Sequence, residues 1–281
     1  DEAVAAHIKS GDKIWLGGLS VADKVLSCVI EKVKQGALEN IDFYGNMTMD
    51  DIGLADKDIP ADKFRYHAFF YGGYEREGCK NGVVTNVPLH LSRFEDYVSY
   101  IDPDVAVVPM TPPNEQGSCN IGPAGYSPSG LNHAKKIIAQ INKNIPRVYG
   151  SSHDYHVNDI AAFVECHKDE LMPSSQPPTA TEEKIASYIL ERIPDGACIQ
   201  LGIGGTANAV GFGLKDKKHL GIHSEMYTDS MAYLQSIGVV DNSRKTFMPG
   251  LSVAGFAFNT AQTNSFIENN PKVYFTPYHY V

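Results

Sequence analysis

Short runs of apolar residues alternate along this chain with stretches in which apolar positions recur every three or four residues. Runs of the first kind have the length of strands, and the longer spacing is typical of amphipathic helices. Their regular alternation predicts an α/β fold with largely parallel strands. Strands are predicted at 13–16, 41–44, 105–109, 197–201 and 219–223, and helices at 22–34, 133–142, 182–192 and 229–236.

The clearest interruption of this pattern is Met172–Thr181, which holds three prolines among small polar residues. Such a composition is typical of an extended connector. Thr181, followed by Glu182 and Glu183, predicts a capped helix start directly after it. We therefore expect a domain boundary near residue 175, with one domain at 1–175 and a second at 176–281.

The two sides of this boundary share a sequence pattern. Ile8–Gly17 resembles Ile193–Gly202, and Tyr44–Asp50 resembles His223–Asp229 after a gap is allowed. This similarity indicates two related α/β halves. Asn46 then holds in the first half the place that Glu225 holds in the second, so one half alone would carry the carboxylate.

Length and charge exclude several classes of protein. With 281 residues and 43% hydrophobic content, the chain can bury a sizeable core. No apolar run approaches the roughly 18 residues of a membrane span, and no N-terminal signal segment is visible. A formal net charge of −9 disfavours nucleic acids and anionic membranes as partners. An anionic ligand could still be held by local amides.

The five cysteines are scattered and form no CxxC pair, which predicts reduced thiols and a cytoplasmic protein. His153 and His156 lie close together, as do Cys166 and His167, but neither pair offers enough ligands for a metal. No metal site is predicted.

A glycine-rich turn, Gly202-Ile203-Gly204-Gly205-Thr206, joins a predicted strand to a predicted helix at 207–214. Glycine permits tight turning, and a helix start leaves backbone amides unpaired. Together these features favour an anion or oxyanion site. The spacing is not that of a dinucleotide fingerprint, and no phosphate-loop lysine follows. A purely structural turn remains an alternative.

Glu225 is expected at the carboxyl end of a strand, just before the predicted helix at 229–236, where open α/β sheets place their ligands. A glutamate is ionised at neutral pH and needs no partner base to act as a nucleophile. The alternative is a glutamate that merely favours a helix dipole. His223 is expected on the same strand face, and a structural role is favoured for it, because carboxylate attack on a thioester requires no proton transfer.

A second loop, 110–122, follows the predicted strand at 105–109. It is either an ordinary surface loop or part of a pocket shared by the two halves. Asn46 and Glu115 are the first candidates for a functional role there.

Over essentially its whole length the chain resembles the acetyl-CoA hydrolase/transferase family of CoA-transferases. The segments that carry the resemblance are Gly11–Lys13, Pro112–Gly117, Ala139–Arg147, Leu201–Val210 and Gly221–Asp229. In the family, the segment like Ala139–Arg147 runs from a helix to a strand. Members usually continue well past residue 281 with further glycine-rich motifs, so the resemblance implies an incomplete second domain.

The resemblance implies two related CoA-transferase-like halves, each an open and mostly parallel sheet. It also implies ping-pong transfer of coenzyme A between a short-chain acyl-CoA and acetate, butyrate or 4-hydroxybutyrate. Glu225 would form a glutamyl-CoA thioester, and Gly202, Ile203, Gly204, Gly205 and Thr206 would line the coenzyme A site. Coenzyme A would be a substrate, with no cofactor bound at rest, and the protein would be a homo-oligomer.

Two alternatives stay open beside the transferase. One is an acyl-CoA thioester hydrolase, in which water intercepts the glutamyl intermediate. The other is a module that binds acyl-CoA or a sugar phosphate without turnover. Neither the acyl group, the acceptor acid nor the physiological direction can be predicted from the sequence.

Overall fold

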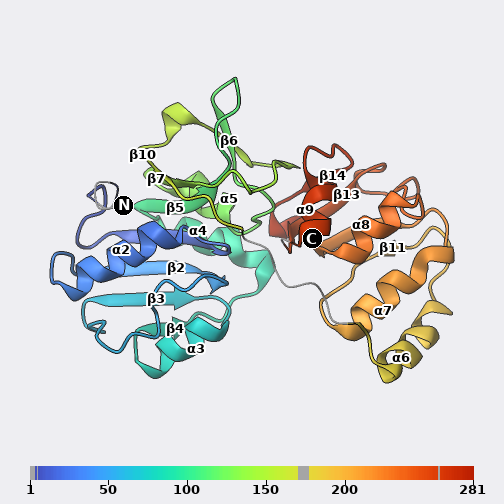
Figure 1. Cartoon of the computed structure of the whole chain (residues 1–281), viewed down its shortest axis with the longest axis horizontal. Coiled ribbons are helices and arrows are strands. Elements are labelled where there is room, and N and C mark those ends of the chain that lie inside the picture. The colour runs from blue at the N-terminus through green and yellow to red at the C-terminus, as the bar shows by residue number, and fades with distance from the viewer. Residues whose placement is uncertain (1–3, 5, 170–176, 259) are drawn as a thin grey trace. The chain divides into compact units, whose positions relative to one another are not determined.

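A computed structural model describes residue 4 and residues 6–169, 177–258 and 260–281 (Figure 1). The chain divides into two compact units. The first comprises residues 1–145 and 152–169, and the second comprises residues 146–151 and 170–281. The boundary predicted near residue 175 lies outside the described residues.

The first unit is built on a parallel sheet of seven strands in the order β10-β7-β5-β1-β2-β3-β4. The chain proceeds outward from β1 to β4, then starts again at β5 and proceeds in the opposite direction. Such a reversal is the topological switch point of an open α/β sheet. The strands are β1 (Lys13–Leu19), β2 (Ile41–Thr48), β3 (Phe64–Ala68), β4 (Val84–Asn86), β5 (Val105–Met110), β7 (Lys136–Ile141) and β10 (Ala162–Glu165).

Helices and a small hairpin-like sheet complete the first unit. The helices are α2 (Asp23–Lys34), α3 (Gly73–Lys80), α4 (Phe94–Ile101) and α5 (Ser127–His133), with 3-10 turns η1 (Leu91–Arg93) and η2 (Val157–Asp159). The strands β6 (Ser118–Asn120) and β9 (Asp154–His156) pair in antiparallel fashion. The predicted helix at 22–34 is confirmed as α2, and the predicted strands at 13–16, 41–44 and 105–109 are confirmed within β1, β2 and β5.

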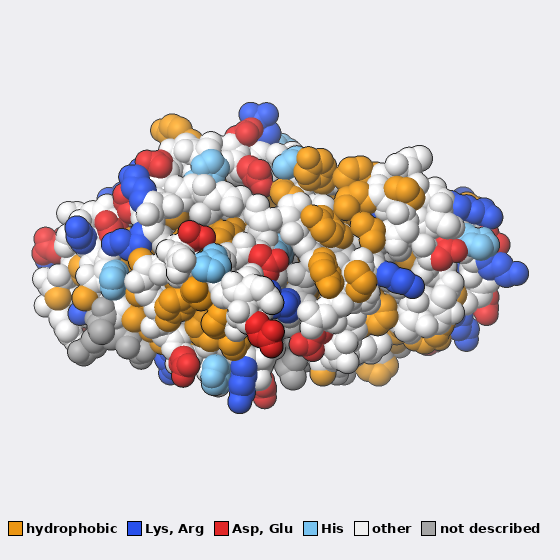
Figure 2. Space-filling view, turned by 90° about the horizontal axis from the view of Figure 1, so that it is seen from above, with side chains coloured by type: hydrophobic (Ala, Val, Ile, Leu, Met, Phe, Trp, Pro, Cys, Tyr) orange, Lys and Arg blue, Asp and Glu red, His pale blue; other side chains and the backbone are white. Residues whose placement is uncertain are grey.

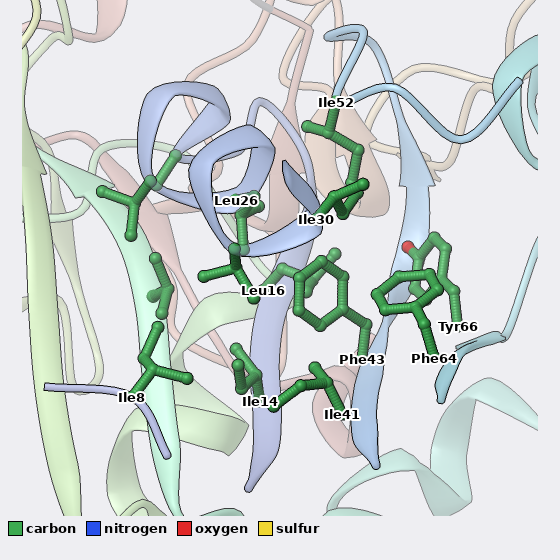
Figure 3. Close-up of a cluster of buried hydrophobic side chains, with 14 of the residues drawn as sticks. Ile8, Ile14, Leu16, Leu26, Ile30, Ile41, Phe43, Ile52, Phe64 and Tyr66 are labelled. Atoms are coloured by element: carbon green, nitrogen blue, oxygen red, sulfur yellow. The ribbon is translucent and has the colours of Figure 1, made fainter. Parts of the chain in front are cut away.

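The core of the first unit lies between α2 and the strands beneath it. The buried residues of α2 are Val25, Leu26, Val29, Ile30 and Val33, a spacing that places them on one helical face. Figure 3 shows Leu26 and Ile30 pointing from this helix toward Leu16 of β1 and Phe43 of β2. The apolar spacing seen in the sequence therefore accounts for how α2 covers the sheet.

The helix predicted at 133–142 is wrong. Residues 136–141 form strand β7, which lies between β5 and β10, and α5 occupies 127–133 instead. Ile137 to Ile141 are all buried, because a central parallel strand is covered on both faces. Ala139–Arg147 is consequently a strand followed by a turn and not a helix-to-strand segment.

The second unit holds a five-stranded parallel sheet in the order β11-β12-β13-β14-β8. Its strands are β11 (Cys198–Ile199), β12 (Gly221–Tyr227), β13 (Ser252–Ala257), β14 (Val273–Phe275) and β8 (Tyr149–Gly150). The predicted strand at 197–201 is reduced to β11, and the one at 219–223 begins later and continues to Tyr227. The edge strand β8 comes from the excursion at 146–151, which was not predicted from the sequence.

The helices of the second unit are α6 (Ala180–Leu190), α7 (Gly205–Gly213), α8 (Asp229–Ser236) and α9 (Ala261–Ile267), with 3-10 turns η3 (Leu214–Asp216) and η4 (Tyr278–Tyr280). The helix predicted at 182–192 is α6, but its N-cap is Thr179 and not Thr181, with Glu182 completing a capping box. In α8, Thr228 is the N-cap. The Asp229 carboxylate instead accepts hydrogen bonds from the hydroxyls of Thr260 and Thr263.

A lysine clamp joins three parts of the first unit. Lys168 Nζ donates to Asp23 Oδ1 and to Asp50 Oδ1, each at 2.8 Å, and the three side chains are 20–22% exposed. Burial alone would raise the pKa of Asp23, but hydrogen bonds from Lys168 and Gln140 outweigh it and hold the pKa below its ordinary value. The clamp therefore ties the segment after β10 to the start of α2 and the end of β2.

Lys168→Met is expected to destabilise the first unit by about 2 kcal/mol at pH 7, because two partly buried carboxylates lose their charged donor. A carboxylate whose pKa is depressed by folding stabilises above its unfolded pKa of about 3.9 and loses this contribution as pH falls through the folded pKa. The difference should therefore shrink below about pH 4. Hydrogen exchange of the α2 amides measures this loss of stability at each pH. Lys57→Met, at an exposed position, is the control. Equal protection in both variants would contradict the clamp.

Candidate functional site

Glu225 lies on β12 near the carboxyl end of the second sheet, two residues before the strand ends. Burial alternates along this strand: Ile222 and Ser224 are buried, whereas His223 and Glu225 are partly exposed. The partly exposed pair therefore shares one face of β12, as the period of a strand requires. This confirms that His223 and Glu225 lie on the same side.

The carboxylate of Glu225 has no hydrogen bond or ion pair within the described part of the chain. Burial is the cause that raises the pKa of Glu225 above its ordinary value of 4.5. Desolvation without a compensating donor disfavours the charged form. An ionised carboxylate in such surroundings keeps its lone pairs uncommitted, as a nucleophile requires.

The glycine-rich turn lies at the same sheet edge as Glu225. β11 and β12 are parallel, and Ile199 is paired with Ile222. Gly202 and Glu225 are each three residues beyond that pair, so the turn leaves β11 at the level where β12 carries the carboxylate. Gly204, the residue before α7, has φ +113°, a conformation that favours glycine. The strand–turn–helix order predicted for this segment is confirmed.

Different structural features explain why glycine occupies each position of this turn. A Cβ on Gly205 would lie 2.1 Å from Glu182 Oε1, so Gly205 allows α7 to approach α6. A Cβ on Gly202 or Gly204 would meet nothing within 4 Å. Ile203 between them is 68% exposed, and Thr206 is partly buried. Helix packing therefore explains Gly205, whereas the space beside Gly202 and Gly204 is open to a ligand.

The N-terminus of α7 differs from those of its neighbours. The helix has no side-chain cap and no acidic residue in its first turn. By contrast, α6 and α9 are capped by threonine hydroxyls, and α8 has Asp229 in its first turn. Within the described part of the chain, no side chain accepts a hydrogen bond from the first amides of α7, although the Glu182 carboxylate lies beside Gly205.

Alanine substitutions separate the two kinds of glycine. Gly205→Ala is expected to cost about 1 kcal/mol, because the new methyl group displaces the Glu182 carboxylate from its bonds to Thr179 at the start of α6. Gly202→Ala should change stability by less than about 0.5 kcal/mol, since its Cβ meets open space. Hydrogen exchange of α6 in the two variants measures the difference. Equal protection would show that Gly205 is not a packing residue.

An aromatic cover lies beside Glu225, and sequence reasoning missed it. The His223 ring stacks on Phe247, with centroids 5.4 Å apart, and Phe247 stacks on Tyr280 at 5.7 Å. His223 Nε2 also bonds the Tyr280 carbonyl oxygen. Because a carbonyl only accepts, Nε2 carries the proton and is committed to this bond. His223 therefore holds the cover in place.

Gly255 of β13 is the residue level with Glu225, between the pairs Ser224↔Ala254 and Met226↔Phe256. A Cβ on Gly255 would lie 2.6 Å from Tyr278 Cε1, so the tyrosine ring fills the place of the missing side chain. An isolated glycine within a strand run is a signal of close approach, and it could have indicated this contact from the sequence. Phe247 and Tyr280 carry no comparable local signal.

Exposed apolar side chains are frequent in this unit. Figure 2 shows hydrophobic side chains gathered in more than one place on this face of the molecule. Large exposed apolar side chains of the second unit include Ile203, Phe212, Ile237, Phe247 and Tyr280. Such gatherings are typical of binding surfaces rather than of inert ones.

No contact in the described part of the first unit joins its two candidate residues, Asn46 and Glu115. Asn46 is buried in β2, and its Oδ1 accepts from the Met47 amide at 2.9 Å. Glu115 is exposed in the turn between β5 and β6. Asn114 orders that turn by accepting from the amides of Gln116 and Ser118. In the described part of the first unit, Asn46 and Glu115 therefore have separate surroundings.

Within the described ranges, no cluster of three or more histidine, cysteine, aspartate or glutamate side chains could hold a metal ion. The described helices are also all too short or too polar to cross a membrane.

Comparison with known proteins assigns relatives to this architecture. Residues 1–174 match the family model for the acetyl-CoA hydrolase/transferase N-terminal domain. The chain is 32% identical over 288 residues to a butyryl-CoA:acetate CoA-transferase of Anaerostipes caccae, covering 100% of this chain and 64% of that protein. It is 37% identical over 217 residues to a 4-hydroxybutyrate coenzyme A transferase of Clostridium kluyveri, covering 75% of this chain and 49% of that protein.

Solved structures show the same fold. RipA from Yersinia pestis superposes with a TM-score of 0.93 at 25% identity, covering 99% of this chain and 67% of that one. A 4-hydroxybutyrate CoA-transferase from Porphyromonas gingivalis gives a TM-score of 0.78 at 25% identity, covering 99% of this chain and 66% of that one. The α/β architecture with two parallel sheets is thereby confirmed. The chain spans less than two thirds of the length of the curated relatives described above.

Proposed function

This chain belongs to the acetyl-CoA hydrolase/transferase family, and from that premise we propose that it transfers coenzyme A between an acyl-CoA and a carboxylic acid, with Glu225 as the nucleophile. The relatives named for butyrate, acetate and 4-hydroxybutyrate suggest short carboxylic acids as the substrate class. The protein would act as a homo-oligomer in the cytoplasm, and its two sheets would represent the halves expected at 1–175 and 176–281.

One observation carries this proposal. Glu225 is a partly buried carboxylate without a hydrogen-bond partner in the described part of the chain, on the strand next to a glycine turn with open space around it. A structural carboxylate would be expected to accept hydrogen bonds, as Glu182 does from the Thr179 amide and as Asp229 does from the hydroxyls of Thr260 and Thr263. Glu225 accepts none within the described part of the chain, which favours a chemical role.

The reaction uses the carboxylate twice. A Glu225 carboxylate oxygen attacks the acyl thioester carbon, the carbon–sulfur bond breaks, and coenzyme A leaves as its thiolate, giving a glutamyl–acyl anhydride. The thiolate then attacks the glutamyl carbonyl carbon, the bond from this carbon to the bridging oxygen of the anhydride breaks, and the first acid leaves as its carboxylate, which gives glutamyl-CoA. A second carboxylate reverses both steps. No proton transfer is needed, because carboxylates and thiolate are the nucleophiles and leaving groups throughout.

The glycine turn would supply donors for the oxyanions of these steps. The unpaired amides at the start of α7 lie at the sheet edge that carries Glu225, and Gly202 and Gly204 let a ligand approach the backbone. Gly202, Ile203, Gly204, Gly205 and Thr206 would together line the coenzyme A site. Each well-placed donor would stabilise the transition state by about 3–4 kcal/mol.

Intact mass spectrometry tests this proposal directly. The protein is incubated with butyryl-CoA or acetyl-CoA in the absence of an acceptor acid, and its mass is recorded before peptide mapping. We expect a coenzyme A adduct on the peptide that contains Glu225, and its removal when acetate is added. A folded protein that binds acyl-CoA without forming any adduct would favour the binding module instead.

A further inference from the structure

The aromatic cover stands directly beside the proposed nucleophile. His223 and Glu225 leave the same face of β12, two residues and roughly 6.6 Å apart along the strand. His223 is stacked under Phe247 with an interplanar angle of 22°, and Phe247 is stacked with Tyr280 at 18°. The three aromatic rings therefore stand in series, beginning at the residue that precedes Glu225 on this face of β12.

A tyrosine from the same turn borders Glu225 on the neighbouring strand. Tyr278 is 1% exposed and lies against Gly255, the residue level with Glu225. Tyr278 and Tyr280 both belong to η4, so one short turn supplies a ring on each of two sides. The ring of Tyr278 therefore lies beside Glu225 across the sheet, and the ring of His223 lies two residues away along β12.

The loop that carries Phe247 is held firmly in place. We name residues 241–251 the covering loop. Asn242 Oδ1 accepts from the Ile222 amide at 2.9 Å, and its Nδ2 donates to Ser252 Oγ at 3.0 Å. Lys245 Nζ donates to the carbonyl oxygens of Ile222 at 2.7 Å and Leu251 at 2.5 Å. These bonds attach the covering loop to β12 and to the start of β13, so Phe247 has a fixed position.

We propose that the stack of His223, Phe247 and Tyr280 excludes water from the Glu225 carbonyl group and thereby determines how the covalent intermediate is partitioned between carboxylic acids and water. This inference rests on the proposed function. Glutamyl-CoA is a thioester, and water that reaches its carbonyl carbon breaks the carbon–sulfur bond. The products are then the Glu225 carboxylate, free coenzyme A thiol and one proton, so the energy of the thioester is lost.

The exposed surface of the stack favours reaction of the intermediate with carboxylic acids over its reaction with water. Phe247 is 37% exposed and Tyr280 is 49% exposed, so both rings present apolar surface at the rim of the site. The hydrocarbon part of a carboxylic acid gains free energy by contacting such rings, whereas a water molecule gains nothing. The same surface therefore favours the acid and disfavours hydrolysis. It assigns Phe247 and Tyr280 as specificity-determining residues.

Phe247→Ala tests the proposal through the lifetime of the adduct. The glutamyl-CoA adduct is formed with butyryl-CoA, freed of excess substrate, and followed by mass spectrometry in acceptor-free buffer and with added acetate. We expect its hydrolysis to accelerate at least about tenfold relative to its reaction with acetate. Phe247→Leu, which keeps an apolar side chain and should fold as the parent does, is expected to show an intermediate ratio.

Phe212→Ala is the matched control, because Phe212 is 40% exposed on α7 and its ring lies tilted against Tyr233, with centroids 5.7 Å apart, outside the cover. It should leave the ratio unchanged. An adduct that forms in both Phe247 variants and hydrolyses at the parent rate would overturn the shielding role while leaving the transferase proposal intact. If the unsubstituted protein forms no adduct, the transferase proposal fails, and this inference fails with it.

Discussion

Glu225→Gln is expected to abolish adduct formation and to lower coenzyme A exchange by at least about a thousandfold, because an amide oxygen is a far poorer nucleophile than a carboxylate. The substitution is isosteric. It also removes a charge whose burial is not compensated by any bond in the described part of the chain. The folded protein should therefore be as stable as the parent or slightly more stable. Exchange between acyl-CoA and labelled acetate measures the loss.

The pH dependence of the parent gives an independent check on Glu225. Burial raises its pKa above 4.5, so the ionised nucleophile disappears at a higher pH than for an exposed glutamate. We expect the acid limb of adduct formation to lie above pH 4.5, and this limb should be absent from the trace activity of Glu225→Gln. Glu191→Gln, at an exposed position of the same unit, is the control. Exchange above one per cent of the parent rate in Glu225→Gln would be incompatible with the proposed role.

Glu75→Ala should produce the largest loss of stability in the first unit, about 3–5 kcal/mol. Glu75 is 0% exposed in α3. Its Oε1 accepts from the amide and the hydroxyl of Thr48 at 2.8 and 3.0 Å, and its Oε2 accepts from the Gly72 amide at 2.9 Å. Alanine would leave these donors without an acceptor and would open a cavity between β2 and α3.

The matched control for Glu75→Ala lies on the same helix. Glu77 is exposed and bonds Lys80 Nζ at 2.7 Å, an arrangement that contributes at most about 1 kcal/mol. Urea unfolding combined with hydrogen exchange of β2 and α3 compares the two variants, so that each unit is followed separately. Similar losses of protection in Glu75→Ala and Glu77→Ala would show that the buried carboxylate does not join the strand to the helix.

Local sequence patterns predicted much of the fold because the burial of each helix or strand is visible in the spacing of its own apolar residues. The segment at 22–34 shows its buried face as a helical spacing, and the segment at 105–109 shows its burial as a continuous apolar run. The same logic failed at 133–142, where a short apolar run can be read either as a buried helix or as a central strand. The neighbours β5 and β10 decide that choice, and they lie far away in the sequence.

The residues of the candidate site likewise fall into those that could be predicted from local sequence and those that could not. The glycine turn follows β11 and Glu225 lies near the end of β12, so they belong to two successive strand–helix units, and their placement at the same sheet edge could be predicted because parallel strands end at the same edge. The stack on His223 could not, because Phe247 and Tyr280 reach it from a loop and from a turn without periodic structure. The N-cap of α6 was misplaced by two positions, since threonines and acids cluster at the start of this helix.

Strand β8 has a consequence for how this protein can be dissected. Residues 146–151 leave the first unit, supply the edge of the second sheet next to β14, and are followed by 152–169, which belong to the first unit again. The polypeptide thus changes unit more than once, and no single cut separates two autonomous fragments. A fragment that begins at residue 177 would lack this strand and expose the β14 backbone, a template for intermolecular β-pairing. Gene fusions or domain exchanges in this family would need to carry the hexapeptide 146–151 with the second unit, although it is encoded within the first.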